Sequence, residues 1–563
     1  AAEAPDTLLL AEAFWLMEGY FVRTLGMHRV YNSAFMNMLR DEKNAEYRLV
    51  IRNTLDFDPQ ILKRYVNFMN NPDERTAVDQ FGRDDKYFGV CTVMVTLPGL
   101  PMFGHGQVEG FAERYGMEFR RAQLQEEPDP ELVARHQREI FPLLHRRELF
   151  AEVDHFQLYD FETPDGSVNE DVFAFSNQYG QDRTLVVYHN RFADTRGWIR
   201  RSVGATQRGL ADGLSLVDED SRYLVLRDER SGLEFLRRQR TLFDEGLYLE
   251  LGAYATYVFL ELREIDDAGG RYGRLADWLG TRGVPSIEQA MAELELQPLH
   301  DALRRALDPA LLRGLLENPG DQRQAHRRDD LEGRVRHLLH EARALARVPD
   351  DAVPTTSDLP DRVRLLAPHG AVGEYLSAEV GDTLSTRAIH ATWALASAID
   401  AALPEEHAAG KWIDQWDCGP MIESALRLLD VDRETAAHAP ALIVALLSLV
   451  DAAVPPDDRP LRAEWLHQDA FRRAIGVSEH DGVTWFNRED FERTVLWVPL
   501  LTLSATSTGE DDGARTRVRE LRPLAEESQY RLAELERLLT AGPAQTEPGA
   551  TPAPPGAKGS SKR

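Results

Sequence analysis

Short apolar segments that each end in a polar residue recur through the first 110 residues. Residues 7–15 read TLLLAEAFW, an apolar run that leads directly into Glu12. This pattern predicts a strand buried on both faces, as in a parallel sheet covered by helices, with Glu12 at its carboxyl end. The alternative is that Glu12 caps the helix that follows, because acidic residues favour helix N-termini.

Two later segments repeat the pattern. Residues 65–75, YVNFMNNPDER, predict a strand followed by a polar turn in which Pro72 fixes the backbone and Asp73 lies just beyond; an ordinary turn is the alternative. In residues 89–110 a helix breaks at Pro98 and Gly99, and a short strand over 100–103 precedes a glycine-rich loop. Alternating strands and helices indicate a parallel α/β fold, in which the carboxyl ends of strands carry active sites.

Together these motifs resemble the second half of the catalytic barrel of the α-amylase family of glycoside hydrolases. LLLAEAFW resembles the fifth-strand motif that ends in the general acid, and FMNNPDE resembles the seventh-strand motif, usually Asn-His-Asp. LPGLPMFGHGQVEGF resembles the eighth-strand segment, which usually ends in Gly-Asp-Glu. The three motifs also agree with the family in order and spacing, so the combination is more specific than any one of them.

The resemblance implies a role for individual residues. Glu12 matches the proton donor that later acts as base, and Asp73 matches the carboxylate that stabilises an oxocarbenium-like transition state. An acetal cleaves when its oxygen is protonated while positive charge grows on the ring, so an acid and an anion must flank it. The side chains assigned to sugar binding are Asn71, Trp15, Arg75 and His105, although a core position is the alternative for Trp15.

The sequence departs from the family at two places. Pro72 stands where the family usually has histidine, and Gln107 and Val108 replace the acidic pair after the last strand. The family's nucleophile, an aspartate after the fourth strand, has no counterpart, since Asp6 only just precedes the first predicted strand. A complete barrel takes about 250 residues, so we expect the chain to be the C-terminal part of a longer enzyme. Alone it should not hydrolyse a glycoside, and its partner would be the N-terminal half of the barrel.

The pattern changes after residue 150. Short alternating segments separated by polar turns predict an antiparallel β-sandwich over residues 151–265, and the α-amylase family commonly carries one after its barrel. The strands predicted lie at residues 155–161, 172–176, 184–188, 223–226 and 247–262. The expected fold is therefore multidomain, with half of a (β/α)8 barrel (strands five to eight) over residues 1–150, followed by the sandwich.

Apolar residues at helical spacing then predict an all-α domain over residues 266–540. We expect its charged residues to lie on the solvent-exposed faces of these helices. Trp412, Trp416 and Cys418 lie close together in the sequence and indicate either a binding patch or a buried corner. The last segment, 541–563, is too poor in apolar residues to fold and should be a disordered tail.

Composition narrows the range of partners. Lys and Arg total 65 against 93 Asp and Glu, and the net charge of −28 argues against nucleic acid and anionic membranes. The longest apolar run of the helical part, residues 441–450, is too short to span a bilayer. Two cysteines give no disulfide framework and favour a reducing cytoplasm. The sequence shows neither zinc-ligand spacing nor a phosphate-binding loop, so we expect no metal or cofactor.

Three functions remain open. The favoured one is a retaining α-glucan hydrolase or transglycosylase of which this chain is the C-terminal portion. The second is a carbohydrate-binding protein on a catalytically decayed amylase scaffold. The third is an interaction protein whose helical domain is the functional part.

Overall fold

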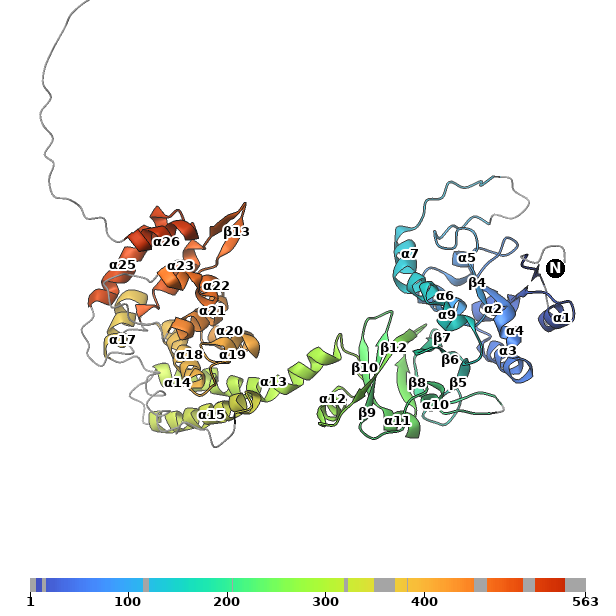
Figure 1. The fold of residues 1–563 in the computed structure, drawn as a ribbon, viewed down its shortest axis with the longest axis horizontal. Coiled ribbons are helices and arrows are strands. Elements are labelled where there is room, and N and C mark those ends of the chain that lie inside the picture. Colours follow the sequence, from blue (N-terminus) through green and yellow to red (C-terminus); the bar gives the residue numbers. More distant parts are fainter. Residues whose placement is uncertain are drawn as a thin grey trace, which may run out of the picture. The chain divides into compact units, whose positions relative to one another are not determined.

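The computed structural model describes residues 7–12, 17–114, 121–204, 206–317, 323–348, 370–381, 383–449, 463–499 and 512–541. Predicted site residue Trp15 and nearly all of the predicted tail lie outside these ranges. The chain divides into two compact units, Ala1–Leu294 and Glu295–Arg563, which we describe separately (Figure 1).

The first unit begins with a parallel sheet of four strands in sequence order. These are β1 (Leu10–Ala11), β2 (Arg29–Tyr31), β3 (Tyr65–Phe68) and β4 (Leu100–Met102). The helices between them are α1 (Glu18–Arg23), α2 (Ser33–Arg40), α3 (Asn44–Phe57), α4 (Gln60–Arg64), α5 (Ala77–Phe81) and α6 (Asp85–Thr96). Each strand pairs in parallel with the next, so their carboxyl ends share one edge of the sheet.

The burial of β1 differs from the sequence prediction. Leu8, Leu9 and Leu10 are exposed, and only Ala11 is buried. These leucines are exposed because β1 is an outer strand of the described sheet and pairs only with β2. Its apolar side chains therefore lack the covering layer that a central parallel strand has.

The turn between α6 and β4 depends on glycine. Gly99 has φ +104°, and a Cβ atom there would lie 2.4 Å from the carbonyl oxygen of Tyr65. A side chain at this position is excluded both by backbone conformation and by the closeness of β3. The predicted break at Pro98 and Gly99 is confirmed, because α6 ends at Thr96.

Residues 130–151 form a helical segment that is broken into several pieces. They are α7 (Pro130–Arg135), the π-helical turn η1 (His136–Ile140), α8 (Phe141–His145) and α9 (Arg147–Ala151). Asp129 caps α7 by accepting hydrogen bonds from the N–H groups of Glu131 and Leu132. Pro142 has no N–H to donate, and the chain widens into the π turn just before it.

An antiparallel sheet of eight strands follows, in the order β10-β9-β12-β7-β6-β5-β8-β11. Its strands are β5 (Gln157–Glu162), β6 (Val172–Tyr179), β7 (Asp182–His189), β8 (Thr195–Ser202), β9 (Arg222–Asp228), β10 (Glu234–Arg238), β11 (Leu247–Leu251) and β12 (Thr256–Asp266). Two short helices, α10 (Leu210–Gly213) and α11 (Gln239–Asp244), lie between strands. All five segments predicted to be strands contain strands, while the sandwich predicted for them stays a prediction.

The hydrogen bonding joins these strands into one sheet rather than two separate ones. Strand β12 pairs with β7 and then, past an irregularity between Phe259 and Glu261, with β9. Strand β5 connects β6 and β8 past a similar irregularity between Tyr159 and Phe161. Such irregularities bend strands, and all eight strands contribute to one apolar core. The sheet therefore curls around its own core.

The other face of the antiparallel sheet packs against the helices of the parallel part. Phe173, Phe175 and Tyr188 from β6 and β7 share a core with residues of α6. A Cβ atom at Gly89 on α6 would lie 2.0 Å from the ring of Tyr188. The absence of a side chain at Gly89 thus lets helix and sheet approach closely.

Helix α12 (Arg271–Leu279) and the start of α13 (Ile287–Ala306) also pack on the sheet. Leu275, Leu279 and Ile287 lie against Tyr223 and Leu236 in a separate small core. The first compact unit therefore extends beyond the last strand, to Leu294.

The second unit is mainly helical. Its helices are α14 (Pro309–Glu317), α15 (Gln324–Leu345), α17 (Gly370–Tyr375), η4 (Leu376–Val380), α18 (Leu384–Asp400), α19 (Lys411–Gln415), α20 (Gly419–Leu428), α21 (Arg433–Leu449), η5 (Ala463–His467), α22 (Asp469–Ala474), α23 (Arg488–Val495), α25 (Asp512–Glu527) and α26 (Leu532–Ala541). A small hairpin, β13 (Ser478–His480) and β14 (Val483–Trp485), interrupts them. Trp412, Trp416 and Cys418 are all buried, as the buried-corner interpretation predicts. Within the described ranges, no helix combines the length and apolarity needed to cross a bilayer.

Candidate functional site

Two predicted catalytic carboxylates share one tyrosine neighbour. Glu12 follows β1, Asp73 lies in the turn after β3, and Tyr31 ends β2 between them. Burial raises the pKa of the Tyr31 phenol, and the negative charges of Glu12 and Asp73 raise it further. Both carboxylates therefore act electrostatically on the same hydroxyl at the carboxyl edge of the sheet. Sequence reasoning missed Tyr31, which lies in a strand of only three residues.

This arrangement makes a prediction about Tyr31. Neutralising either carboxylate, by Glu12→Gln or Asp73→Asn, should lower the pKa of Tyr31 toward the ordinary tyrosine value of 10.0, because each removes a charge that disfavours the phenolate. A pH titration of the assigned tyrosine ring carbons by NMR would measure the shift. Asp79→Asn, at an exposed position on α5, is the matched control. An unchanged titration in both site variants would place the carboxylates away from Tyr31.

The turn that carries Asp73 is held by Asn71. The Asn71 side-chain oxygen accepts hydrogen bonds of 3.0 Å from the N–H groups of Asp73 and Glu74. Arg114 also donates a hydrogen bond to the carbonyl oxygen of Asp73. Asn71 is buried, so its evident role is to fix the turn. Its contact with a sugar stays a prediction.

The other predicted sugar-binding residues in the described ranges lie at the surface. Arg75 is exposed, with its Nη1 3.6 Å from a carboxylate oxygen of Asp79. His105 is exposed in the loop after β4, and its ring centroid lies 6.2 Å from that of Phe111. Both side chains are therefore accessible to a ligand, and their contact with a sugar stays a prediction.

Gln107, which replaces a family acid in the sequence comparison, is buried and holds the loop after β4. Its Oε1 accepts a hydrogen bond of 3.1 Å from the N–H of Gly104. Its carbonyl oxygen accepts one of 2.8 Å from the hydroxyl of Tyr87. Tyr87 in turn lies 3.2 Å from Nε2 of His136, whose pKa burial lowers. Gln107 is thus part of the internal support of the site.

Asn70 adds an unexpected feature. The residue is 4% exposed, and its Oδ1 has no hydrogen-bond partner among the described residues. It lies against Gly104, where a Cβ atom would come within 2.4 Å of that oxygen. The amide of Asn70 therefore occupies the space that a side chain at Gly104 would need.

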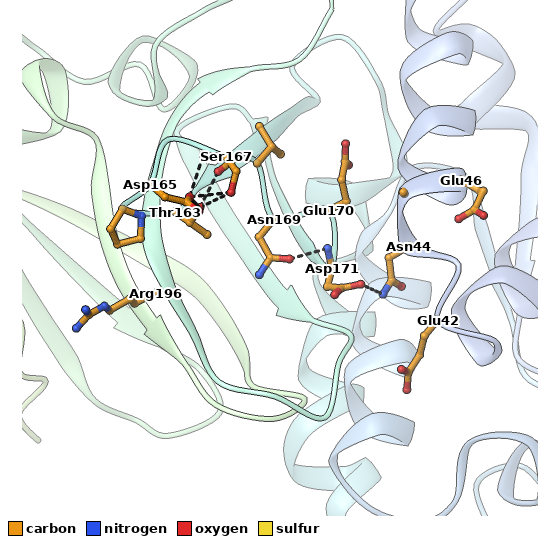
Figure 2. Close-up of a pocket in the computed structure, with 13 residues that line it drawn as sticks. Glu42, Asn44, Glu46, Thr163, Asp165, Ser167, Asn169, Glu170, Asp171 and Arg196 are labelled. Atoms are coloured by element: carbon orange, nitrogen blue, oxygen red, sulfur yellow. Dashed lines mark hydrogen bonds between the residues drawn. The ribbon is translucent and has the colours of Figure 1, made fainter.

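A polar pocket lies elsewhere in the first unit (Figure 2). It measures about 700 Å³ and lies between the start of α3 and the turn joining β5 to β6. Its labelled polar residues are Glu42, Asn44, Glu46, Thr163, Asp165, Ser167, Asn169, Glu170, Asp171 and Arg196. Neither predicted catalytic carboxylate lines it.

Several of these side chains form hydrogen bonds with one another. Asn44 donates a hydrogen bond of 2.7 Å to Asp171, whose own N–H donates to the Asn169 side chain. The hydroxyls of Thr163 and Ser167 lower the pKa of Asp165 to about 2. Across the described part of the chain, no three His, Cys, Asp or Glu side chains are grouped as metal ligands. We therefore treat this pocket as a polar junction between α3 and the antiparallel sheet.

Two ion-pair clusters anchor the parallel part to the antiparallel sheet. Arg48 on α3, whose side chain is 4% exposed, binds Asp160 and Glu170 at 2.6 Å each. It also donates to the carbonyl oxygens of Tyr159 and Val172.

Glu139 on η1 is the centre of the second cluster. Its side chain is 7% exposed and binds Arg135 on α7 at 2.8 Å and Arg230, in the turn between β9 and β10, at 2.7 Å. Burial opposes ionisation of Glu139, but these two guanidinium groups hold its pKa below the usual range.

Comparison with known proteins gives matches only among solved structures. No family model and no curated protein matches the chain. The matched structures include the α-amylase from H. orenii (15% identity, TM-score 0.30) and the Nostoc punctiforme debranching enzyme (14% identity, TM-score 0.34). A third is the α-amylase from Geobacillus thermoleovorans in complex with acarbose (16% identity, TM-score 0.32). Each match covers 46% of this chain, which spans about half the length of those proteins, 53–54%.

The chain resembles enzymes of the α-amylase family. In the first unit, the parallel strands bring Glu12 and Asp73 to one edge of the sheet, on which Tyr31 ends β2. Pro72 is exposed in the turn that Asn71 holds.

Proposed function

We propose that this chain forms part of an α-glucan-active glycoside hydrolase or transglycosylase of the retaining type. The observation that supports this most directly is that Glu12, directly after β1, and Asp73, in the turn after β3, follow strands of one parallel sheet whose carboxyl ends share an edge. The matches to the family's fifth- and seventh-strand motifs assign the same two residues.

In the proposed reaction Glu12 protonates the glycosidic oxygen as the bond to the leaving sugar breaks. Asp73 hydrogen-bonds to ring hydroxyls and stabilises the positive charge that develops on the ring. Tyr31 ends β2, the strand between those that precede the two carboxylates. Its phenol is protonated at neutral pH, as an unperturbed tyrosine is, and in the proposed reaction it donates a hydrogen bond to the substrate.

Retention of configuration requires a nucleophilic carboxylate about 5 Å from the acid. We propose that this third carboxylate, and the strands that carry it, come from a further barrel segment that completes the parallel sheet. The exposed outer strands of the parallel sheet support this proposal. Among the described strands, β1 and β4 are the outer ones, and Leu10 and Leu100 on them are exposed.

A second candidate is glucan binding without turnover. It is favoured by Pro72, which removes the family's usual histidine contact to the sugar, and by the burial of Gln107. In this case the same edge of the sheet would hold the ligand, and Glu12 would not act as an acid.

Titration of the full chain with maltoheptaose tests the shared part of both candidates. We expect Asp73→Ala to weaken binding about ten- to a hundredfold, because it removes charge-assisted hydrogen bonds to hydroxyls worth about 1.5–3 kcal/mol. Asp84→Ala, at an exposed aspartate before α6 whose side chain makes no capping hydrogen bond, should leave binding unchanged. Equal affinities in the two variants would contradict the role of Asp73.

Release of reducing sugar from starch separates catalysis from binding. We expect none from the chain alone, because the nucleophile is proposed to lie on another segment. Turnover that Glu12→Gln abolishes would contradict that proposal while supporting Glu12 as the acid.

A further inference from the structure

A second hollow lies on the outer face of the antiparallel sheet, away from the Glu12 edge. It measures about 420 Å³, within the range of about 300–1,000 Å³ typical of small-ligand pockets. It is lined by Trp198, Leu236, Arg237, Arg238, Thr241, Leu242, Glu245, Gly246, Tyr248, Ala276, Asp277, Gly280 and Thr281. These residues come from β8, β10, α11, β11 and the end of α12.

An aromatic pair forms one wall of this hollow. Trp198 on β8 and Tyr248 on β11 are direct partners across the two strands, with ring centroids 5.0 Å apart. Their chain neighbours Ile199, Leu247 and Leu249 belong to the core, so the two rings project to the outer face. Both rings are half-buried. The two ring planes are tilted by 58° to each other, so each ring offers its own apolar face on which a pyranose ring can stack.

Arg237 contributes hydrogen-bond donors to the hollow. Its Nη1 donates to the carbonyl oxygens of Leu236 and Gly280, and its Nη2 donates to that of Thr281. No described carboxylate forms an ion pair with Arg237, whose pKa burial lowers to about 10. Its Nε–H and one Nη2 hydrogen are therefore not taken up by the hydrogen bonds of the described residues.

The charges around the hollow are balanced. Arg237 and Arg238 supply two positive charges, and Glu245 and Asp277 supply two negative charges, with Arg238 and Asp277 paired at 2.7 Å. An anionic ligand would meet the two carboxylates as well as the chain's overall charge of −28. Neutral hydroxyl groups, which both donate and accept hydrogen bonds, match a lining that offers both.

We propose that this hollow is a second carbohydrate-binding site, which holds a short neutral glucan stacked on Trp198 and Tyr248. The inference rests on the proposed function for the choice of sugar. It adds a second site at which the chain can bind glucan without cleaving it.

A purely structural role for the aromatic pair is the competing explanation. Strand β11 is an outer strand of the sheet, and cross-strand aromatic pairs stabilise such strands by about 0.2–1 kcal/mol. Arg200 also lies over the Trp198 ring at 4.8 Å without lining the hollow. A structural role predicts a change in stability but none in glucan affinity.

Calorimetric titration of the full chain with maltoheptaose distinguishes the two explanations. We expect Trp198→Leu to weaken one class of site about tenfold, which corresponds to about 1.4 kcal/mol, while Trp198→Phe retains most of the affinity. Trp278→Leu is the matched control, because Trp278 is 39% exposed on α12 but does not line the hollow. Thermal melting of each variant verifies that the sheet remains folded.

The outcomes separate this proposal from the proposed function. Binding lost in Trp198→Leu but kept in Asp73→Ala supports the second site even if the Glu12 edge holds no sugar. Binding lost in Asp73→Ala and unchanged in a folded Trp198→Leu would overturn the second site and leave the proposed function intact. Binding of inorganic phosphate that Arg237→Ala abolishes, without binding of maltoheptaose, would also overturn it.

Discussion

Replacing Glu139 by alanine is expected to lower the free energy of unfolding of the first unit by about 3–5 kcal/mol, the usual cost of removing one partner from a buried ion pair. The side chain is 7% exposed, and its partners Arg135 and Arg230 are 19% and 14% exposed. Without Glu139 the two guanidinium groups would keep only Asp85, which is 61% exposed, as a shared carboxylate partner. Urea unfolding followed by circular dichroism would measure the loss.

Arg138→Ala is the control, because Arg138 also contacts Glu139, at 3.2 Å, but is 61% exposed. Its loss should cost less than about 1 kcal/mol, as for other surface ion pairs. A similar loss in both variants would mean that burial does not determine the strength of this cluster.

The same cluster gives the protein an acid-sensitive component of stability. The pKa of Glu139 is lowered in the folded chain, so its contribution is present above the ordinary glutamate pKa and is lost as pH falls through the lowered value. Glu139→Gln should make the free energy of unfolding less dependent on pH in this acid range.

Replacing Arg48 by methionine is expected to cost about 3 kcal/mol, near the lower end of the range for buried pairs. Its partners Asp160 and Glu170 are 30% and 47% exposed, so each can regain some hydration when the guanidinium is removed. The carbonyl oxygens of Tyr159 and Val172 would lose their donor. The loss would be measured by the same urea unfolding.

Arg191→Met is the matched control for Arg48. Arg191 is 50% exposed, and its Nη1 lies 3.4 Å from Glu42. A cost of less than about 1 kcal/mol is expected. If Arg48→Met cost no more than this control, the carbonyl contacts of Arg48 would not stabilise the junction.

Three of the four parallel strands could be predicted from the sequence. β1, β3 and β4 each end an apolar segment at a polar residue or a glycine-rich loop, and this pattern predicts a strand. It does not predict burial for β1, whose Leu10 is exposed. β2 could not be predicted in the same way, because Arg29–Tyr31 has only one fully buried residue, Val30. Tyr31, which ends β2 on the same edge of the sheet as the two carboxylates, was missed for this reason.

The internal support of the site depended on contacts that a sequence does not display. The side chain of Gln107 bonds to Gly104, and that of Asn71 bonds to its own turn. Polar residues in a loop after a strand look the same whether they face a ligand or the backbone. Asn70, with its unpartnered Oδ1, became recognisable only from its burial.

The order in which the antiparallel strands pair could not be predicted from the sequence either. Alternation predicts strands and their buried faces, but the pairing of β12 with both β7 and β9 depends on a local irregularity. The π turn at His136–Ile140 also left no clear pattern, since its residues have ordinary helical spacing.

The burial of Gln107 limits how the loop after β4 can be redesigned. Restoring a family-like acid by Gln107→Glu would place a carboxylate at a position that is 1% exposed, beside the sulfur of Met69. An ionised group there would be desolvated and would weaken the loop instead of reaching a sugar. Engineering that seeks to add an acid to this loop should begin at His105, whose side chain already faces solvent.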